Sequence, residues 1–570
     1  MTAYKQYRWV MREPDQESIE NLMQSINVSE PIARALVNRG VKNYDEAKSF
    51  FRPSIEHLHS PFLMNGMKEA AERLSKAIDE REKILIYGDY DVDGTTATAL
   101  LILFLKKFEA EVDFYVNDRK TEGYGIARTG IDYAISQNVK VIVTVDCGVT
   151  AIEPIKYCRE NQIDVIICDH HEAKAERPDA LAILDAKQDD CAYPFKDLSG
   201  CGVAFKLACA LCDLRGIDRE IAYEFLDFVA LAVAADIVPV VEENRALMFE
   251  GIKRLQLAKR PGLKALAKVS GLDIERLSSS SLVFALSPRI NAAGRLDHAR
   301  EAIKLLIAQD ESDAEAAAMH LGDLNKTRRE IDADVFKEAE EDAKKLLTQY
   351  ASSIVLYKPD WHLGVIGIVA SRIVERFYLP TIILTENDGI LKGSARSVVG
   401  FNLFNAISHC ETHLIQFGGH EMAAGLSLHI EQLDEFRSAF DNHCAETLDF
   451  ELRTPAIQID AELNLEQITP RFYNVLKQFE PCGPGNMHPL FLTRNVTPAY
   501  PPKLLKEQHL KFAVRDKDGR IFDVIGFGMA HYFEALKESG RTVSLVYSID
   551  ENEWNGKTTF QLRLRDLKVE

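Results

Sequence analysis

The sequence has no uncharged apolar run of the roughly 18 residues that a membrane-spanning helix needs, and no apolar stretch at its start. Membrane insertion and secretion are therefore not expected. It also lacks the paired CxxC motifs of a structural zinc domain. Cys209 and Cys212 form a single such motif inside the apolar stretch KLACALCDL, where packing in a core is the expected role. Cys147, Cys158 and Cys168 lie in or beside apolar runs, which is typical of reduced thiols in a cytoplasm.

Positive charge is also scarce, because the 570 residues carry a net charge of −19. This balance argues against indiscriminate binding of nucleic acid, although it does not exclude a local basic groove. The hydrophobic content of 46% and the charged content of 27% are those of a globular protein. At this length we expect several domains.

The stretch ILIYGDYDVDGTTAT (84–98) is the centre of the sequence pattern. An apolar run ends at Gly88, Asp89, Asp91 and Asp93 follow at alternate positions, and a helical stretch begins after Gly94. This pattern predicts a buried strand, a tight acidic loop and a helix. Carboxylates crowded at a strand end repel one another, and divalent cations are the usual remedy. The alternative is a solvated acidic turn.

Further short strands alternate with helices, at 112–117, 139–145 and 163–168. This alternation predicts a parallel sheet with helices on both faces, which binds ligands beyond the carboxyl ends of its strands. Each strand is followed by polar residues: Asn117, Asp118 and Arg119, then Asp146, then Asp169, His170 and His171. Carboxylates and imidazoles without cysteine suit Mn²⁺, Mg²⁺, Fe²⁺ or Zn²⁺, and so many carboxylates can hold two cations.

Asp236 is a further candidate ligand, because it closes the wholly apolar stretch FVALAVAA. An aspartate in that setting is rarely left unpaired. The alternative is a carboxylate at a helix end that faces water.

Several long motifs, in order along the chain, resemble one family. IYGDYDVDGTTATA, VTVDCG and CDHHE look like the DHH phosphoesterase superfamily, and the wider pattern is similar to that of the bacterial RecJ exonucleases, which are specific for single-stranded DNA. The wider pattern comprises VNDRKTEGYG, YPFKDLSGCGVAFK, SPRINAAGRLDHA, DWHLGVIGIVASR, KGSARS and QFGGHEMAAG. The resemblance extends from about residue 60 to the C-terminus.

The resemblance implies a set of metal ligands. Asp91 and Asp93 would hold two Mn²⁺ or Mg²⁺ ions, Asp146 would bridge them, and His170 and Asp236 would complete the set. Asp89 and His171 would belong to the site with less defined roles, His171 contacting the scissile phosphate or protonating the leaving oxygen. Some members of the superfamily carry a histidine where this chain has Tyr87, so one metal would lack an imidazole, and Asp89 is the natural substitute.

Substrate contacts are predicted outside the metal site. Arg289, Asn291 and Arg295 are expected in a loop around Gly294, where they suit phosphate binding, the alternative being salt bridges to the acidic core. In a second α/β domain, the KGSARS loop offers Ser394 and Arg396. With Arg119, these residues are expected to bind a 5′-terminal phosphate, unless KGSARS is an ordinary hairpin turn. The QFGGH segment adds Gly419 and His420.

The expected fold is a multidomain α/β protein with a parallel-sheet DHH domain, a long linker helix, a smaller α/β DHHA1 domain and a C-terminal OB-like β-barrel. The last part rests on five strand-like runs, a count that resembles a single-strand-binding barrel. The predicted limits are 1–60 for an N-terminal helical segment, 61–310 for the DHH metal-binding catalytic domain, 311–349 for the linker helix, 350–455 for the DHHA1 substrate-binding domain and 456–570 for the OB-fold-like single-strand-binding domain.

The predicted function is a two-metal 5′→3′ exonuclease that degrades single-stranded DNA to mononucleotides in DNA repair and recombination. The resemblance also implies a single-strand-binding protein and a RecQ-type helicase as partners. The reduced cysteines favour a cytoplasmic location, and the multidomain build suits a monomer. Two alternatives stand beside it: a DHH phosphodiesterase for short oligonucleotides or cyclic dinucleotides, and a replication-fork scaffold without catalysis.

Overall fold

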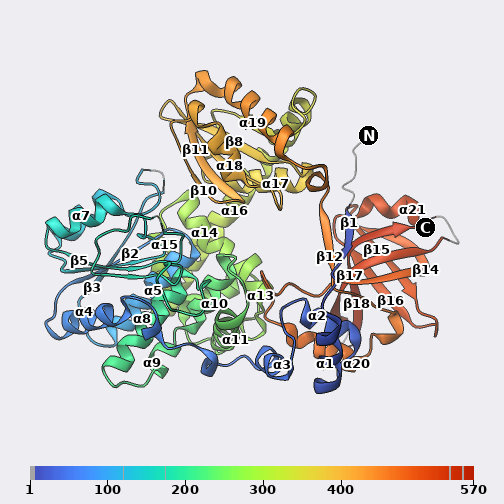
Figure 1. Cartoon of the computed structure of the whole chain (residues 1–570), viewed down its shortest axis with the longest axis horizontal. Coiled ribbons are helices and arrows are strands. Elements are labelled where there is room, and N and C mark those ends of the chain that lie inside the picture. Colours follow the sequence, from blue (N-terminus) through green and yellow to red (C-terminus); the bar gives the residue numbers. More distant parts are fainter. Residues whose placement is uncertain (1–6, 120, 174, 538–540, 555–556) are drawn as a thin grey trace.

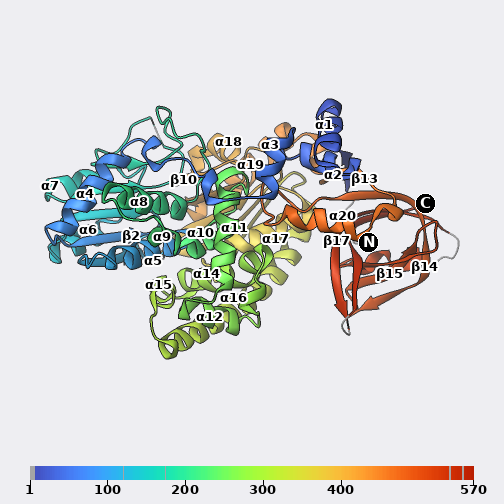
Figure 2. The ribbon, with the colours of Figure 1, turned by 90° about the horizontal axis from the view of Figure 1, so that it is seen from below.

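The computed structural model describes residues 7–119, 121–173, 175–537, 541–554 and 557–570. Three folded bodies are connected by a long helix and extended segments (Figures 1 and 2): a parallel-sheet domain on the left, a small α/β domain above and a β-barrel on the right. The linking helix α16 (Glu311–Leu346) is 36 residues long. The expected fold class is confirmed. No helix in the described ranges combines the length and apolar character that crossing a membrane requires.

The first domain is built on a five-stranded, wholly parallel sheet in the order β3-β2-β4-β5-β6. Its strands are β2 (Ile84–Gly88), β3 (Val112–Val116), β4 (Val141–Val145), β5 (Asp164–Cys168) and β6 (Ala182–Leu184). The chain runs from β2 to β3 on one side and then returns to β4 on the other. The strand order therefore reverses at β2, and this is where open α/β sheets bind their ligands.

Two hydrophobic cores cover the two faces of this sheet. Ile84 and Ile86 of β2 point into the larger core, whereas Leu85 and Tyr87 point into the smaller one. This alternation is the period of two that a β-strand imposes. The larger core is shared with α4 (Met67–Asp79), α5 (Val92–Lys106), α8 (Gly200–Leu214) and α10 (Leu226–Ala235), and the smaller with α6 (Arg128–Ser136) and α7 (Ile152–Glu160). The buried Cys209 and Cys212 belong to the larger core, as expected.

A group of helices extends this domain towards α16: α11 (Glu242–Gln256), α12 (Pro261–Val269), α14 (Ser287–Leu296) and α15 (Arg300–Ile307). The prediction that SPRINAAGRL forms a loop was wrong, because these residues are α14. A π-helical turn (Leu282–Leu286) leads into it and Pro288 lies in its first turn, where proline is tolerated. Gly294 is needed for close packing, since a Cβ there would lie 2.5 Å from the carbonyl oxygen of Tyr90.

The second α/β domain contains a five-stranded mixed sheet in the order β10-β11-β9-β8-β7. Its strands are β7 (Ile354–Tyr357), β8 (Thr381–Asn387), β9 (Ile390–Arg396), β10 (Gln416–Gly419) and β11 (Ala423–Leu428), and its helices are α17 (Ile366–Phe377), α18 (Leu403–His409) and α19 (Leu433–Thr447). The predicted KGSARS loop is instead part of β9, where Ser394 pairs with Ile383 on one side and Gly425 on the other. Glycine at 393 leaves room for the neighbouring leucines, and a side chain there would clash with Leu384.

The C-terminal part is a closed barrel of five strands, with the two-residue strand β13 (Ala461–Glu462) added to β14. The barrel strands are β14 (Phe491–Leu505), β15 (His509–Arg515), β16 (Ile521–Gly526), β17 (Val543–Trp554) and β18 (Lys557–Val569). Pairing of β14 with β17 closes the ring. The stretch HYFEALKESG (531–540) favours a helix, and α21 (Phe533–Lys537) forms there, while residues 538–540 lie outside the described part.

The N-terminal segment packs on this barrel rather than on the domain that follows it in sequence. Strand β1 (Arg8–Met11), which was not predicted, pairs in parallel with β12 (Ala456–Ile459). Helices α1 (Gln16–Ile26), α2 (Glu30–Val37) and α3 (Tyr44–Phe51) contribute to the same core as the barrel strands. The segment is therefore a packed extension of the barrel.

A buried ion pair supports the larger core. Lys206 Nζ lies 2.6 Å from Glu243 Oε1, and the two side chains are only 2% and 1% exposed. Glu243 also accepts hydrogen bonds from the hydroxyl group of Tyr193 and the backbone N–H of His59. This pair therefore joins α8 and α11 to the start of the domain.

We expect Lys206→Met to lower the free energy of unfolding of this domain by about 3–5 kcal/mol, because it leaves the Glu243 carboxylate buried without its counter-charge. Lys264→Met is the matched control, since Lys264 pairs with Glu311 at the surface, and this loss should cost about 0–1 kcal/mol. Thermal melting of both variants measures the difference. Equal melting temperatures would contradict a supporting role for the buried pair.

Candidate metal centre

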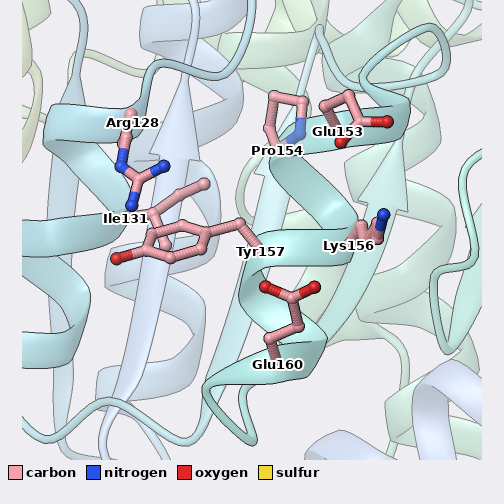
Figure 3. Close-up of a pocket in the computed structure, with 7 residues that line it drawn as sticks. All are labelled: Arg128, Ile131, Glu153, Pro154, Lys156, Tyr157 and Glu160. Carbon is pink, nitrogen blue, oxygen red and sulfur yellow. The ribbon is translucent and has the colours of Figure 1, made fainter.

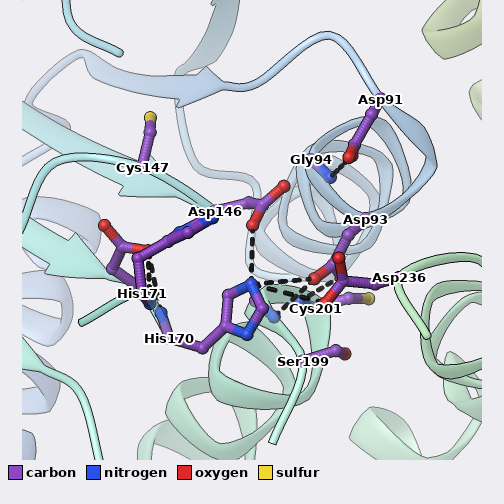
Figure 4. A network of polar contacts seen from close by, with 12 residues as sticks. Asp91, Asp93, Gly94, Asp146, Cys147, His170, His171, Ser199, Cys201 and Asp236 are labelled. Atoms are coloured by element: carbon purple, nitrogen blue, oxygen red, sulfur yellow. Dashed lines mark hydrogen bonds and ion pairs between the residues drawn. The ribbon is translucent and has the colours of Figure 1, made fainter. Parts of the chain in front are cut away.

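Carboxylates from two adjacent strands meet at the point where the strand order reverses. Asp89, Asp91 and Asp93 follow β2, and Asp146 follows β4 (Figure 4 labels the last three). Two separate sets of three metal-ligating side chains lie here, each with its ligand atoms within 4.8 Å of one another: Asp89, Asp91 and Asp146, and Asp93, His170 and Asp236. A third set, Asp146, His170 and His171, shares a residue with each of them. The structure therefore brings together residues that are up to 147 positions apart in the sequence.

Backbone N–H groups hold two of these carboxylates in place. Asp93 is fully buried and accepts hydrogen bonds from the N–H groups of Gly200 (2.6 Å) and Cys201 (2.7 Å), at the N-terminus of α8. Asp91 caps α5 by accepting from the N–H of Gly94 at 3.1 Å. Helix N-termini favour negative charge, so both helices stabilise the carboxylates that they position.

Asp146 lies in a left-handed backbone conformation, with φ of 61°. Its N–H donates to the carbonyl oxygen of Cys168 at 2.9 Å, which ties the end of β4 to the end of β5. Gly200 packs directly against it, and a Cβ at that glycine would lie 2.8 Å from the Cβ of Asp146. The site thus depends on a strained turn and a glycine to hold Asp146 in the centre.

His170 connects the two sets of ligands. Its Nε2 lies 3.1 Å from Asp146 Oδ1, 3.5 Å from Asp236 Oδ2 and 3.8 Å from Asp93 Oδ2 (Figure 4). Burial and the neighbouring His171 lower the pKa of His170 to about 3, so the ring is neutral near pH 7 and can coordinate a metal. Asp236 ends α10 and turns towards this ring, which favours the ligand interpretation over a carboxylate that faces water.

Asp169 positions both histidines and was not selected from the sequence as a site residue. Its Oδ1 accepts from the N–H of His170 at 2.8 Å and lies 2.7 Å from His171 Nδ1, while Oδ2 accepts from the N–H of Val149. The Asp169 carboxylate raises the pKa of His171 against the opposing effect of burial. The hydroxyl group of Tyr124 lies 3.2 Å from His171 Nδ1, and Tyr124 is a second residue that was not selected from the sequence.

The acidic cluster is electrostatically unfavourable without cations. Burial, followed by repulsion from neighbouring aspartates, raises the pKa values of Asp89, Asp146 and Asp236 well above the usual range. The same causes raise the pKa of Asp93 to about 7. A divalent cation would remove this repulsion, and oxygen and imidazole ligands suit Mn²⁺ and Mg²⁺.

Tyr87, at the position where some superfamily members carry a histidine, is not oriented as a ligand. Its hydroxyl group donates to Asn117 and accepts from the N–H of Ala127. The side chain belongs to the smaller core, where its role is structural. Asp89 is instead the residue that joins Asp91 and Asp146.

Several arginines gather beside the acidic cluster. The nearby charges of Arg119, Arg328 and Arg396, added to burial, lower the pKa of Arg295 to about 10. Arg295 also donates to the carbonyl oxygen of Gly364 at 3.1 Å, a contact between α14 and the second α/β domain. Arg328, on α16, was not predicted. Mutual repulsion among guanidinium groups next to a metal site favours a polyanionic ligand.

The other predicted substrate residues are placed in different ways. On β9, Arg396 Nη1 donates to Ser394 Oγ at 2.9 Å. Arg289 and Asn291 lie on α14, and Arg289 Nη1 donates to the carbonyl oxygen of Ala285 at 2.7 Å. Gly419 ends the edge strand β10, and the N–H of His420 donates to Ala423. The hydrogen bonds of these last two residues run to β11 and not to the acidic cluster.

A hollow of about 260 Å³ lies on the face of the sheet that carries the smaller core and is separate from this site (Figure 3). It lies between α6 and α7, and Arg128 stacks on Tyr157 with its Cζ 4.0 Å from the ring centre. None of the residues that line it belongs to the acidic cluster. It therefore adds nothing to the metal chemistry.

Comparison with known proteins assigns each part of the chain. Residues 83–233 match the DHH family, N-terminal domain; residues 344–446 match the DHHA1 domain; and residues 459–566 match the RecJ OB domain. The chain is 39% identical to the single-stranded-DNA-specific exonuclease RecJ of Bacillus subtilis, over 99% of this chain and 71% of that protein. It is 35% identical to the Escherichia coli protein of the same name, over 93% of this chain and 95% of that one.

A solved structure agrees with these matches. RecJ from Thermus thermophilus in complex with Mn²⁺ superposes with a TM-score of 0.82 at 29% identity, covering 99% of this chain and 79% of that one. The same protein has been solved with Mg²⁺. With an acidic site at the switch point of the sheet and the full series of domains, the chain belongs to the RecJ family of DHH proteins.

Proposed function

We propose that this protein is a metal-dependent 5′→3′ exonuclease that degrades single-stranded DNA to mononucleotides, in DNA repair and recombination. The observation that carries the proposal is the cluster of five aspartates and His170 at the strand-order reversal. The relatives that share this domain series are named single-stranded-DNA-specific exonucleases. Manganese or magnesium is the proposed cofactor, since both occur in a related structure.

We infer that the site takes two ions. Asp89, Asp91 and Asp146 would hold one, and Asp93, His170 and Asp236 the other, with Asp146 near enough to His170 to bridge them. When bound, two cations about 3.5–4 Å apart stabilise the attacking and leaving oxygens of an in-line displacement at phosphorus. Asp169 holds the two imidazole rings in position, and its negative charge raises the pKa of His171, which favours the protonated ring. His171 is therefore the candidate for contacting the scissile phosphate or protonating the leaving oxygen.

The 5′-terminal phosphate is proposed to bind Ser394, Arg396 and Arg119. The Arg396 guanidinium group already donates to the Ser394 hydroxyl group, and the charge of Arg119 adds to burial in lowering the pKa of Arg396. A terminal dianion would relieve this repulsion. Bound there, the chain end would stop at a fixed distance from the metals, so that one nucleotide is released at a time. Arg289, Asn291, Arg295, Gly419 and His420 are proposed to contact the strand that follows.

The remaining proposals rest on the domain series. The barrel is proposed to bind single strands without base preference, as such barrels do. A single-strand-binding protein and a RecQ-type helicase remain the predicted partners, and a cytoplasmic monomer the predicted form. The five domain limits given from the sequence stay predictions. Neither alternative function is favoured, because the RecJ OB domain is present and every predicted metal ligand is in place.

The first test uses a single-stranded oligonucleotide labelled at its 3′ end, with Mn²⁺. We expect the native protein to shorten it from the 5′ end and Asp146→Asn to lower the rate by about 10³-fold or more, because each ion stabilises the transition state by several kcal/mol. Asp164→Asn, on the same sheet, is the matched control, since this exposed carboxylate pairs with Arg73. Cleavage of dinucleotides but not of long strands would favour the short-substrate alternative.

A second test addresses the chain end. Ser394→Ala and Arg396→Gln are expected to slow digestion of 5′-phosphorylated strands by roughly 10- to 100-fold, since charge-assisted hydrogen bonds are worth about 1.5–3 kcal/mol. Strands with a 5′-hydroxyl group should be affected much less. The ratio of the two rates is the measurement, with Lys392→Gln on β9 as control. A ratio that stays at the native value would show that the 5′ phosphate binds elsewhere.

A third test exploits the repulsion within the cluster. A carboxyl group whose pKa is raised on folding holds a proton that the unfolded chain has released, so stability falls as pH rises above the ordinary value of 3.8. In EDTA, the Asp236→Asn variant should therefore have a higher melting temperature than the native protein at pH 8. The difference should be smaller at pH 5. Each unit of pKa shift is worth about 1.4 kcal/mol.

In Mn²⁺ the native protein should instead have the higher melting temperature, because the ion stabilises only the protein with a complete ligand set. Melting in EDTA and in Mn²⁺ at both pH values is the measurement. If the Asp236→Asn variant has a lower melting temperature than the native protein in EDTA at pH 8, the Asp236 carboxylate has a structural role instead.

A further inference from the structure

A second group of metal-ligating side chains, which shares no residue with the acidic cluster, lies in the segment EPCGPGNMHP that joins the middle of the chain to the barrel. Glu480, Cys482 and His488 each offer one ligand atom, and these atoms lie within 4.8 Å of one another. The Nε2 atom of His488 is 3.5 Å from Glu480 Oε1. Three different ligand types thus converge within nine residues of chain.

Neighbouring groups orient these ligands. Glu480 Oε2 accepts hydrogen bonds from the Ser279 hydroxyl group and from the N–H of Cys482, both at 2.9 Å. These bonds direct Oε1 towards His488. The buried thiol of Cys482 contacts the carbonyl oxygen of Phe479 at 3.7 Å and also interacts with the Glu480 carboxylate. Second-shell hydrogen bonds of this kind hold carboxylate ligands in position at metal sites.

The backbone around the group is held from both sides. Arg245 of α11 donates to the carbonyl oxygens of Phe479 and Pro481, and also to those of Gln478 and Glu480. Asn486 Nδ2 donates to the Phe479 and Pro481 carbonyls at 2.8 and 2.9 Å. The ligands are therefore presented by a fixed turn and not by a free loop, so little ordering would be needed to bind an ion.

We propose that Glu480, Cys482 and His488 form a zinc site. A thiolate with an imidazole and a carboxylate suits Zn²⁺, whereas Mn²⁺ and Mg²⁺ prefer oxygen ligands. The side chains of His488 and Glu480 are 40% and 39% exposed, so water can complete a tetrahedral set. Two anionic ligands balance the charge of the ion next to the Arg245 guanidinium group.

The position of the site indicates a structural role. Ser279 and Arg245 belong to the helices of the first domain, and Arg245 also donates to the carbonyl oxygen of Phe50 in the N-terminal segment. His488 lies three residues before β14, the first long strand of the barrel. A bound ion would fix the turn that sets the barrel against the catalytic domain.

Cobalt distinguishes this site from the acidic cluster, because a thiolate bound to Co²⁺ absorbs in the near ultraviolet by charge transfer and carboxylates do not. Titration of the metal-free full chain with Co²⁺ should give this absorption with an intensity that corresponds to about one thiolate-bound ion per chain, while Co²⁺ in the acidic cluster contributes none of it. It should disappear in Cys482→Ser and persist in Cys410→Ser, another buried cysteine. Addition of Zn²⁺ should remove the absorption by displacing Co²⁺.

A variant at a half-exposed position tests whether misfolding explains the loss of absorption in Cys482→Ser. His488→Gln changes a half-exposed side chain and should weaken Zn²⁺ binding, measured against a chelating dye, by at least about tenfold. No charge-transfer band in the native protein would overturn the proposal and leave Glu480 and His488 as an ion pair. A band that survives in Cys482→Ser would also overturn it, since the thiolate would then be another cysteine, such as Cys147 or Cys201 beside the acidic cluster.

Discussion

Mutual repulsion of buried carboxylates at the edge of the parallel sheet is the constraint on which the rest of the structure depends. Asp89, Asp93 and Asp146 are almost completely removed from water, where like charges cannot be screened. The protein offsets part of this cost with fixed dipoles, because α8 directs two N–H groups at Asp93 and α5 one at Asp91. A divalent cation would remove the remaining repulsion. The unfavourable electrostatics of the metal-free cluster therefore favour metal binding at this edge of the sheet.

Local clustering of positive charge explains how a chain with a negative net charge can bind a polyanion. The net charge of −19 is spread over the whole sequence, whereas Arg119 and Arg396 lie close enough to Arg295 that their charges add to burial in lowering its pKa. Their positive field adjoins the acidic cluster, and a phosphate between the two would meet cations on both sides.

The sequence predicted the sheet, the long helix and the barrel, because those features leave periodic local signals. The ligand set came from the family resemblance, and the structure brings those residues together. It failed at α14 and β9. The stretch SPRINAAGRL contains proline, glycine and asparagine, which locally favour a loop, but packing of Gly294 against the acidic loop imposes a helix. KGSARS carries turn residues, yet pairing with strands on both sides makes it central in the sheet. Asp169, Tyr124 and Arg328 were missed because their roles depend on tertiary contacts.

Helix α14 has a consequence for mechanism that a loop would not have. In a helix, Arg289, Asn291 and Arg295 are fixed by backbone hydrogen bonds, and Arg295 reaches the second α/β domain through Gly364. Gly294 packs on Tyr90, which lies between Asp89 and Asp91 in the acidic loop. A shift of the second domain would therefore be transmitted through α14 to the acidic loop. In the proposed binding mode, a strand held by Arg396 and by metal ions in the acidic cluster would span the same two regions, so that α14 would couple binding of the chain end to the order of this loop.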